Sequence, residues 1–241
     1  MSVESTKTAL VVSAHSADFV WRCGGAIALY AKRGYKVTIV CLSYGERGES
    51  AKLWRQPGMT MDRVKKGRHE EAQRAAELLG GRLVVFDTGD YPMRLNDAHF
   101  DRMVDLYREI RPEFVLTHSL ADPYNADHPA VSQFAQETRI TAQAHGHKPE
   151  VKVIGAPPVF LFEPHQPEQC SFNPQVYLPI DEVWDLKRKA MECMNAQEYL
   201  WEYYTRVALQ RGMQAARNSD SKVTYAEAYQ RIFPQVSDAL A

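Results

Sequence analysis

Cysteine is scarce in this chain, and its spacing excludes the common cysteine-based sites. Only four of the 241 residues are cysteines, and none of them form a C-x-x-C pair (Cys23, Cys41, Cys170 and Cys193). Cys41 lies within an apolar run, where a free thiol behaves as a small hydrophobic side chain. We therefore expect reduced thiols, as in proteins of the cytosol, rather than disulfides.

An excess of charge of one sign and a long apolar run are also missing. The 29 basic residues are balanced by 30 acidic ones, for a formal net charge of −1, which leaves no electrostatic footprint for nucleic acid or an anionic membrane. No window approaches the ~20 apolar residues that a membrane-spanning helix needs. Residues Met1–Lys7 are polar and contain no apolar core of a signal peptide. The sequence predicts a cytoplasmic protein without a nucleic-acid or membrane partner.

Apolar runs of strand length alternate with segments of helical spacing. The expected strands are 8–14, 36–43, 83–86, 114–117 and 159–162, and the expected helices are 24–33, 60–79, 98–110, one opening at Pro129, 181–217 and 225–232. Gly34 and Gly80 follow two of these helices as stop signals. The alternation predicts an α/β fold: a three-layer α/β/α, Rossmann-like structure with a mostly parallel sheet. We expect one domain over residues 1–241, with a helical C-terminal segment from about 181.

The C-terminal segment carries a stripe of large apolar side chains (Trp184, Leu186, Met191, Met194, Leu200 and Tyr204). A stripe at helical spacing is more typical of core or subunit contact than of a cofactor site. We expect the protein to be a homo-oligomer.

Histidine and aspartate side chains recur where two of the expected strands end. His15 and Asp18 follow the first strand, and Asp127 and His128 come shortly after the fourth. In an open α/β sheet the ligand crevice lies outside the carboxyl ends of the strands. Imidazole and carboxylate groups suit Zn²⁺, and three protein ligands with one open position are typical of a catalytic zinc. Alternatively, His15 and Asp18 form an ordinary turn in which Asp18 caps a helix.

The residues around these pairs resemble the LmbE-like (PIG-L) family of zinc-dependent N-deacetylases. That family carries A-H-P-D-D-E after its first strand and H-P-D-H much later, and this chain has A-H-S-A-D-F at 14–19 and N-A-D-H at 125–128. The resemblance covers most of positions 8–200, through Gly45-Glu46-Arg47-Gly48, Arg68 with Glu71, Leu116-Thr117-His118 and Phe162-Glu163. It implies an LmbE-like fold and a Zn²⁺ cofactor bound by His15, Asp18 and His128.

The departures from the family pattern affect catalysis. The family's general base is replaced by Ala17, whose methyl group cannot accept a proton. Asn125 replaces a histidine that stabilises the oxyanion, and Ser16 and Phe19 replace the proline and the glutamate of the first motif. The resemblance is strongest to the branch of the family that hydrates carboxymuconates during gallate breakdown. It implies a zinc-dependent hydratase (a lyase) that adds water across a conjugated C=C bond of a small tricarboxylate.

A hydratase without a carboxylate at position 17 needs other groups to transfer protons. Glu49 is the preferred base, ahead of Glu46, since both lie in the loop after the second strand; the alternative is a solvated run of charges. His165 follows the fifth strand and is the preferred acid, although the two roles are interchangeable at this stage. For substrate binding we expect Arg47, Arg68, His118 and Asn125, since arginine suits carboxylates. Arg68 with Glu71 equally fits a structural ion pair.

Two other functions fit the sequence. One is an N-deacetylase that acts on an acetamido sugar and uses Glu46 or Glu49 in place of the missing aspartate. The other is a zinc-bearing binding module without catalytic activity. His145 and His147 have spacing that can bind metal, but they follow a helix, and we expect them in an exposed loop at the opposite edge of the sheet.

Overall fold

The computed structural model describes residues 6–238. Residues 1–5, most of the polar segment Met1–Lys7, and residues 239–241 lie outside the described part. The first elements are β1 (Thr8–Ser13), α1 (Asp18–Lys32), β2 (Lys36–Cys41), α2 (Ala51–Trp54), α3 (Met61–Leu79), β3 (Gly81–Val85), α4 (Asp97–Ile110), β4 (Phe114–Thr117), α5 (Asp127–Ala142) and β5 (Val159–Phe162). They are followed by β6 (Val176–Pro179), the 3-10 helix η1 (Asp181–Val183), α6 (Trp184–Glu192), the 3-10 helix η2 (Asn195–Leu200), α7 (Trp201–Arg217) and β7 (Ala226–Arg231).

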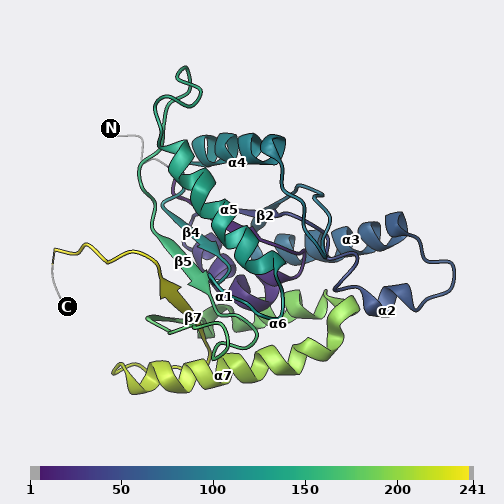
Figure 1. The fold of residues 1–241 in the computed structure, drawn as a ribbon. Helices are drawn as coiled ribbons and strands as arrows, with labels where there is room; N and C mark the ends of the chain where they lie inside the picture. The colour runs from purple at the N-terminus through teal and green to yellow at the C-terminus, as the bar shows by residue number, and fades with distance from the viewer. Residues whose placement is uncertain (1–5, 239–241) are drawn as a thin grey trace.

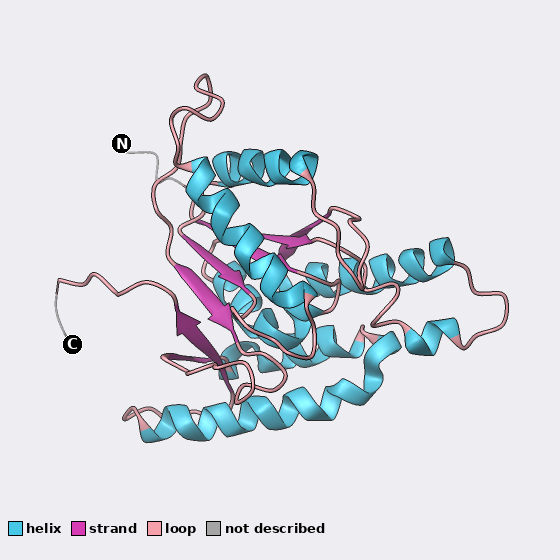
Figure 2. Cartoon of the chain, viewed as in Figure 1, coloured by secondary structure: helices cyan, strands magenta, loops and turns pink. Residues whose placement is uncertain are grey.

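The strands form one sheet in the order β3-β2-β1-β4-β5-β7-β6 (Figure 2). Strands β1 to β5 pair in parallel with their neighbours, whereas β7 runs antiparallel to both β5 and β6. The prediction of a mostly parallel sheet is confirmed.

Helices cover both faces of the sheet (Figure 1). On one face α1, α3 and α6 pack together, and on the other α4 packs against α5. Side chains of β1 alternate between the two cores, because Ala9 and Val11 face the α1 side while Leu10 and Val12 face the α4–α5 side. Burial on both faces explains why the first strand is a continuous apolar run. The prediction of three layers is confirmed.

The parallel strands bring distant parts of the sequence to one edge. The segments that follow β1, β2, β4 and β5 all leave from the carboxyl ends of parallel strands, and hence from the same edge. These segments carry, in turn, His15, Glu49, His128 and His165.

Two helices begin earlier than predicted. We expected helix 24–33, but α1 begins at Asp18 and is interrupted by the non-helical backbone of Cys23. Nearly every residue of its first part is buried, so that part shows no amphipathic period. The helix expected at Pro129 begins at Asp127.

At the C-terminal end one prediction is wrong and one strand was missed. Residues 225–232 are not helical, because β7 occupies Ala226–Arg231 between β5 and β6. Strand β6 was not expected at all. The helices expected within 181–217 are present, divided into α6 and α7. The four cysteines are free, and in residues 6–238 no helix is long and apolar enough to cross a membrane.

Candidate metal centre and active-site cavity

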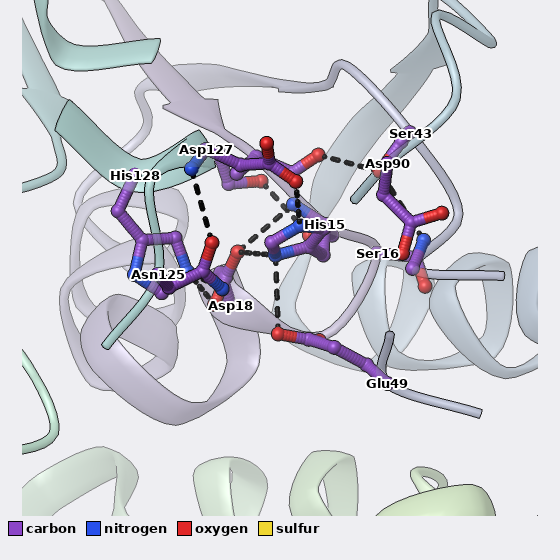
Figure 3. A network of polar contacts seen from close by, with 12 residues as sticks. His15, Ser16, Asp18, Ser43, Glu49, Asp90, Asn125, Asp127 and His128 are labelled. Atoms are coloured by element: carbon purple, nitrogen blue, oxygen red, sulfur yellow. Dashed lines mark hydrogen bonds and ion pairs between the residues drawn. The ribbon is translucent and has the colours of Figure 1, made fainter. Parts of the chain in front are cut away.

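Four side chains at this edge of the sheet gather their polar atoms in one place. One ligand atom from each of His15, Asp18, Glu49 and His128 lies within 4.8 Å of the other three. His15 follows β1, Asp18 opens α1, Glu49 comes from the loop after β2, and His128 lies in the first turn of α5. Figure 3 shows the His15 imidazole surrounded by carboxylates. The three ligands that the family resemblance implies thus lie together, with Glu49 as a fourth group.

The His15 ring is oriented by carboxylates on both of its nitrogens. Nδ1 lies 3.1 Å from Asp18 Oδ2 and 3.1 Å from Glu49 Oε1, while Nε2 lies 3.3 Å from Asp127 Oδ2. An Nε2–H that donates to Asp127 leaves Nδ1 facing the cluster as the metal-binding atom. Burial lowers the pKa of His15, but Glu49, Asp127 and Asp18 together raise it well above its ordinary value. A proton or a metal ion is therefore favoured among these carboxylates.

His128 presents its other nitrogen to the cluster. Its Nδ1 lies 2.8 Å from Asp122 Oδ2, and its Nε2 lies 3.6 Å from Asp18 Oδ1. An Nδ1–H that donates to Asp122 leaves Nε2 available for a metal. Although Asp127 precedes His128 directly in the sequence, it orients His15, and Asp122 orients His128.

Two neighbouring loops hold Glu49 in place. The Asp90 carboxylate accepts hydrogen bonds from the backbone N–H groups of Arg47 (2.9 Å) and Gly48 (2.8 Å). A Cβ at Gly48 would lie 2.2 Å from the ring of Tyr91, so only glycine permits this close approach. Burial raises the pKa of Glu49, but the imidazoles of His15 and His128 lower it, and the net shift is downward. Glu49 is therefore ionised at neutral pH.

The cluster opens into a cavity of about 290 Å³. The wall combines Asp18, Glu49, Asn125, His128 and His165 with Trp21, Arg22, Gly48, Tyr91, Asp122, Tyr124, Gln166, Gln197, Tyr199, Leu200 and Tyr204. His165 comes from the segment after β5, and residues 197–204 come from the C-terminal helices. The expected catalytic pair, Glu49 and His165, thus shares one cavity with the metal cluster.

The ring of His165 is held by two tyrosines of α7. It stacks on Tyr203, with ring centroids 4.2 Å apart, and its Nδ1 lies 3.4 Å from the Tyr204 hydroxyl. Burial and, next, the Arg22 guanidinium lower the pKa of His165. The imidazole is therefore neutral before an anion enters the cavity.

Of the four predicted substrate-binding residues, Asn125 borders the cavity and His118 lies directly behind it. Asn125 Nδ2 donates to the Tyr91 hydroxyl at 2.8 Å. His118 stacks on His128 with centroids 4.2 Å apart and accepts a hydrogen bond from the backbone of Ala14. Burial and the neighbouring His128 lower the pKa of His118 to about 3. His118 is thus a neutral support for the metal ligand.

Three other predicted site residues lie away from the cavity that the described residues form. Glu46 is buried and accepts a hydrogen bond from the backbone of Tyr44 at 3.2 Å. Arg47 points at the next loop, with Nη1 2.8 Å from the Asp90 carbonyl oxygen. The guanidinium of Arg68 is fully buried, 2.6 Å from Glu71 and 3.0 Å from Gln197. Arg68 therefore fits the alternative interpretation, a structural ion pair with Glu71, and it supports the cavity wall through Gln197.

Sequence reasoning missed Asp122, Tyr91 and Arg22. Asp122 and Tyr91 lie in loops whose paths depend on tertiary contacts. Arg22 lies in the part of α1 that precedes the predicted helix 24–33. His145 is exposed in the segment after α5, as expected, whereas His147 is half-buried, with Nε2 3.6 Å from Asp101 Oδ1.

The metal cluster and the motifs that carry it match a known family. The family model described as GlcNAc-PI de-N-acetylase, PIG-L, matches residues 10–138. The chain belongs to the PIG-L family. The matched part contains His15, Asp18, Glu49 and His128, and it ends before His165 and the C-terminal helices that complete the cavity.

A relative whose name gives a different activity from de-N-acetylation is similar to this chain over almost its whole length. The 4-oxalmesaconate hydratase of Pseudomonas putida KT2440 is 60% identical over 239 residues, which cover 98% of this chain and 93% of the relative. The crystal structure of a 4-carboxy-2-hydroxymuconate hydratase from the same organism has a TM-score of 0.96 and 60% identity. It covers 98% of this chain and 100% of that one.

Deacetylases share the fold at lower identity. The N,N'-diacetylchitobiose deacetylase of Pyrococcus horikoshii has a TM-score of 0.78 and 19% identity, with 95% of this chain and 85% of that one covered. This likeness shows a common fold only.

Proposed function

We propose that this PIG-L family protein is a hydro-lyase, a 4-oxalmesaconate hydratase that acts without the general base of the deacetylases. The observation that carries the proposal is the pairing of a metal-donor cluster with a buried alanine at position 17 and an ionised Glu49 facing the same cavity. The 60% identity to a 4-oxalmesaconate hydratase over almost the whole chain supports the substrate. The product is 4-carboxy-4-hydroxy-2-oxoadipate, formed by adding one water across the C=C bond.

The donor set fits a Zn²⁺ ion. His15 Nδ1, His128 Nε2 and an Asp18 oxygen would hold it, which is the mixture of nitrogen and oxygen ligands that zinc accepts with one position left open. When bound, zinc supplies Lewis acidity that polarises a substrate oxygen and acidifies a water molecule. Asp127 and Asp122 fix the two imidazoles in the tautomers this arrangement needs.

Glu49 is the proposed base. Its carboxylate is ionised, lies beside the cluster and borders the cavity. It would orient the attacking water and take one of its protons.

His165 is the proposed acid, which delivers a proton to the carbon that develops negative charge. Its pKa is lowered in the free protein, but a bound polyanion raises the pKa of a nearby imidazole. Substrate binding would therefore charge His165 in the complex, where the proton is needed. Tyr203 and Tyr204 keep its ring directed at the cavity.

The finer expectations from the sequence stay predictions. They are zinc as the native metal, assembly of identical copies, a cytoplasmic location and a place in gallate breakdown. The deacetylase alternative is disfavoured because Asn125 replaces the oxyanion-stabilising histidine and because Glu46, one of its two candidate bases, does not border the cavity. The silent binding module is disfavoured because Glu49 and His165 share the cavity with the cluster.

The test is an assay of the purified zinc-loaded protein on 4-oxalmesaconate and, in parallel, on an acetamido sugar. We expect hydration, seen as loss of the conjugated chromophore, and no release of acetate. His128→Ala should lose both zinc and hydration, whereas the control His145→Ala, in an exposed loop, should keep both. Acetate release would favour the deacetylase, and inactivity on both substrates would favour the binding module.

A further inference from the structure

Among the described residues that border the cavity, Arg22 is the single lysine or arginine. The other ionisable groups there are carboxylates, imidazoles and tyrosines, and three of them are carboxylates (Asp18, Glu49 and Asp122). A substrate with three carboxylates entering this wall meets like charge. Besides the metal, only Arg22 offers a permanent positive charge against it.

The guanidinium of Arg22 is held at the cavity wall with one end unused. Nε donates to Asp18 Oδ1 at 3.3 Å, and Nη1 donates to the Glu163 carbonyl oxygen at 3.1 Å. Nη2 has no hydrogen-bond partner within residues 6–238. It is also not fully buried, so a ligand can reach it. The Arg22 side chain is nearly buried and borders this cavity, and it also borders a smaller one of about 20 Å³ beside Glu163 and Lys187. Nη2 is therefore the guanidinium nitrogen left for a ligand in the larger cavity.

Neighbouring groups fix both ends of this side chain. Its helix position, four residues after Asp18, directs it back over the metal ligand. The guanidinium also lies 6.0 Å from the ring centroid of Phe162. Because the guanidinium is already immobilised, binding an anion costs little further side-chain entropy.

We propose that Arg22 binds one carboxylate of the substrate through Nη2 and so selects tricarboxylates over analogues with fewer carboxylates. The inference rests on the proposed function, whose substrate it explains. Arg47 and Arg68, the arginines that sequence reasoning favoured, do not border the cavity, and their guanidinium groups are bonded to Asp90 and Glu71. The carboxylate that Arg22 binds is one that the metal does not engage.

The competing explanation is that Arg22 only positions Asp18. Arg22→Gln removes the charge and Arg22→Lys keeps it, whereas the control Arg33→Gln removes a charge from the exposed end of the same helix. A first measurement is calorimetric binding of propane-1,2,3-tricarboxylate to each zinc-loaded protein, with zinc content measured in parallel. We expect a loss of affinity on the order of 100-fold for Arg22→Gln, a smaller loss for Arg22→Lys and none for Arg33→Gln.

A second measurement compares kcat/KM for 4-carboxy-2-hydroxymuconate and for 2-hydroxymuconate, which lacks one carboxylate. The ratio of the two values does not depend on the fraction of enzyme that holds metal. It should fall on the order of 100-fold in Arg22→Gln and stay unchanged in Arg33→Gln. An unchanged ratio together with unchanged binding of propane-1,2,3-tricarboxylate would overturn the proposal and leave Arg22 as a positioning residue. If the wild type binds the tricarboxylate but hydrates neither compound, the proposed function fails while the binding role of Arg22 stands.

Discussion

At the scale of single residues, position 17 separates this chain from the deacetylases. The Ala17 side chain is fully buried and packs in the core cluster on the α1 side of the sheet. It therefore occupies space that the surrounding protein has closed. A carboxylate at this position would be desolvated and would lie next to Asp18, both of which are unfavourable.

We expect Ala17→Asp to lower kcat/KM for hydration by about 10²-fold or more, since the new carboxylate competes for the water and repels an anionic substrate. No amide hydrolysis should appear. Ala17→Asn, which has the same shape without the charge, should be less impaired. Both variants are measured on 4-oxalmesaconate with zinc quantified; a gain in hydration rate for Ala17→Asp would contradict our interpretation of this position.

The roles of Glu49 and His165 give a second residue-scale prediction. Glu49→Gln and His165→Asn should each reduce kcat by about 10²–10⁴-fold, the usual contribution of a general acid or base. Zinc content should change far less. Glu150→Gln, at an exposed glutamate, is the control and should keep normal kcat. If both variants keep near-normal kcat with full zinc, other groups must transfer the protons.

Much of this site was predictable at the residue scale, but not all of it. His15, Asp18 and His128 follow from donor chemistry and family motifs, because short motifs fix their own neighbours in sequence. Arg22 has no such motif. Its role depends on which side chains share a cavity with it, and residues as distant as 165–204 contribute to that cavity.

At the scale of elements, strands with local apolar runs were predictable and β7 was not. The sequence Ala226-Glu227-Ala228 is rich in helix formers, so propensity favours a helix. Pairing with β5 on one side and β6 on the other overrides that preference. The glutamate of this strand, Glu227, is buried, and it is accepted in the sheet because its carboxylate is hydrogen-bonded and paired with a lysine.

Glu227 makes several buried contacts with α1 and α6. Its carboxylate accepts hydrogen bonds from the backbone of Gly25 (2.7 Å) and Ala26 (2.8 Å), just after the break at Cys23, and pairs with Lys187 Nζ at 2.7 Å. These contacts satisfy N–H groups that the interrupted helix leaves free. The break thus depends on a residue about two hundred positions away.

Glu227→Gln should therefore destabilise the protein by about 3 kcal/mol, because Lys187 is left buried with its charge unpaired. The double variant Glu227→Gln with Lys187→Met should recover about 1 kcal/mol or more of that loss, since no unpaired charge remains. Denaturant unfolding of wild type and both variants provides the numbers. A double variant less stable than the single one would show that the charge pair is not the cause.

At the scale of the whole molecule, the metal cluster joins segments from β1, β2 and β4. A metal ion that binds the folded chain but not the unfolded chain stabilises the fold by RT ln(1 + [L]/Kd). This is about 2.7 kcal/mol when the free metal concentration is a hundred times Kd. We expect removal of zinc with a chelator to lower Tm by roughly 5–10 °C. Scanning calorimetry before and after adding back zinc measures the shift. The Tm of His128→Ala should not change when zinc is added. A wild-type Tm that does not change with zinc would argue against a bound metal.

The C-terminal helices belong to the same structure as the sheet. Helix α6 packs against α1 and α3, and α7 packs against β6 and β7. These contacts support the proposal that residues 1–241 form one domain.

The position of β7 also has a consequence for folding of the chain during its synthesis on the ribosome. Strand β6 is translated about fifty residues before β7, yet it can join the sheet only through β7, since β7 lies between it and β5. While the chain is emerging, β5 has an open edge, β6 has no partner strand, and α7 lacks β7, against which it packs. The sheet, and the packing of the helix that carries Tyr203 and Tyr204, are therefore completed only after β7 has been made. Until then, β5 is the edge that a chaperone would need to shield from other chains.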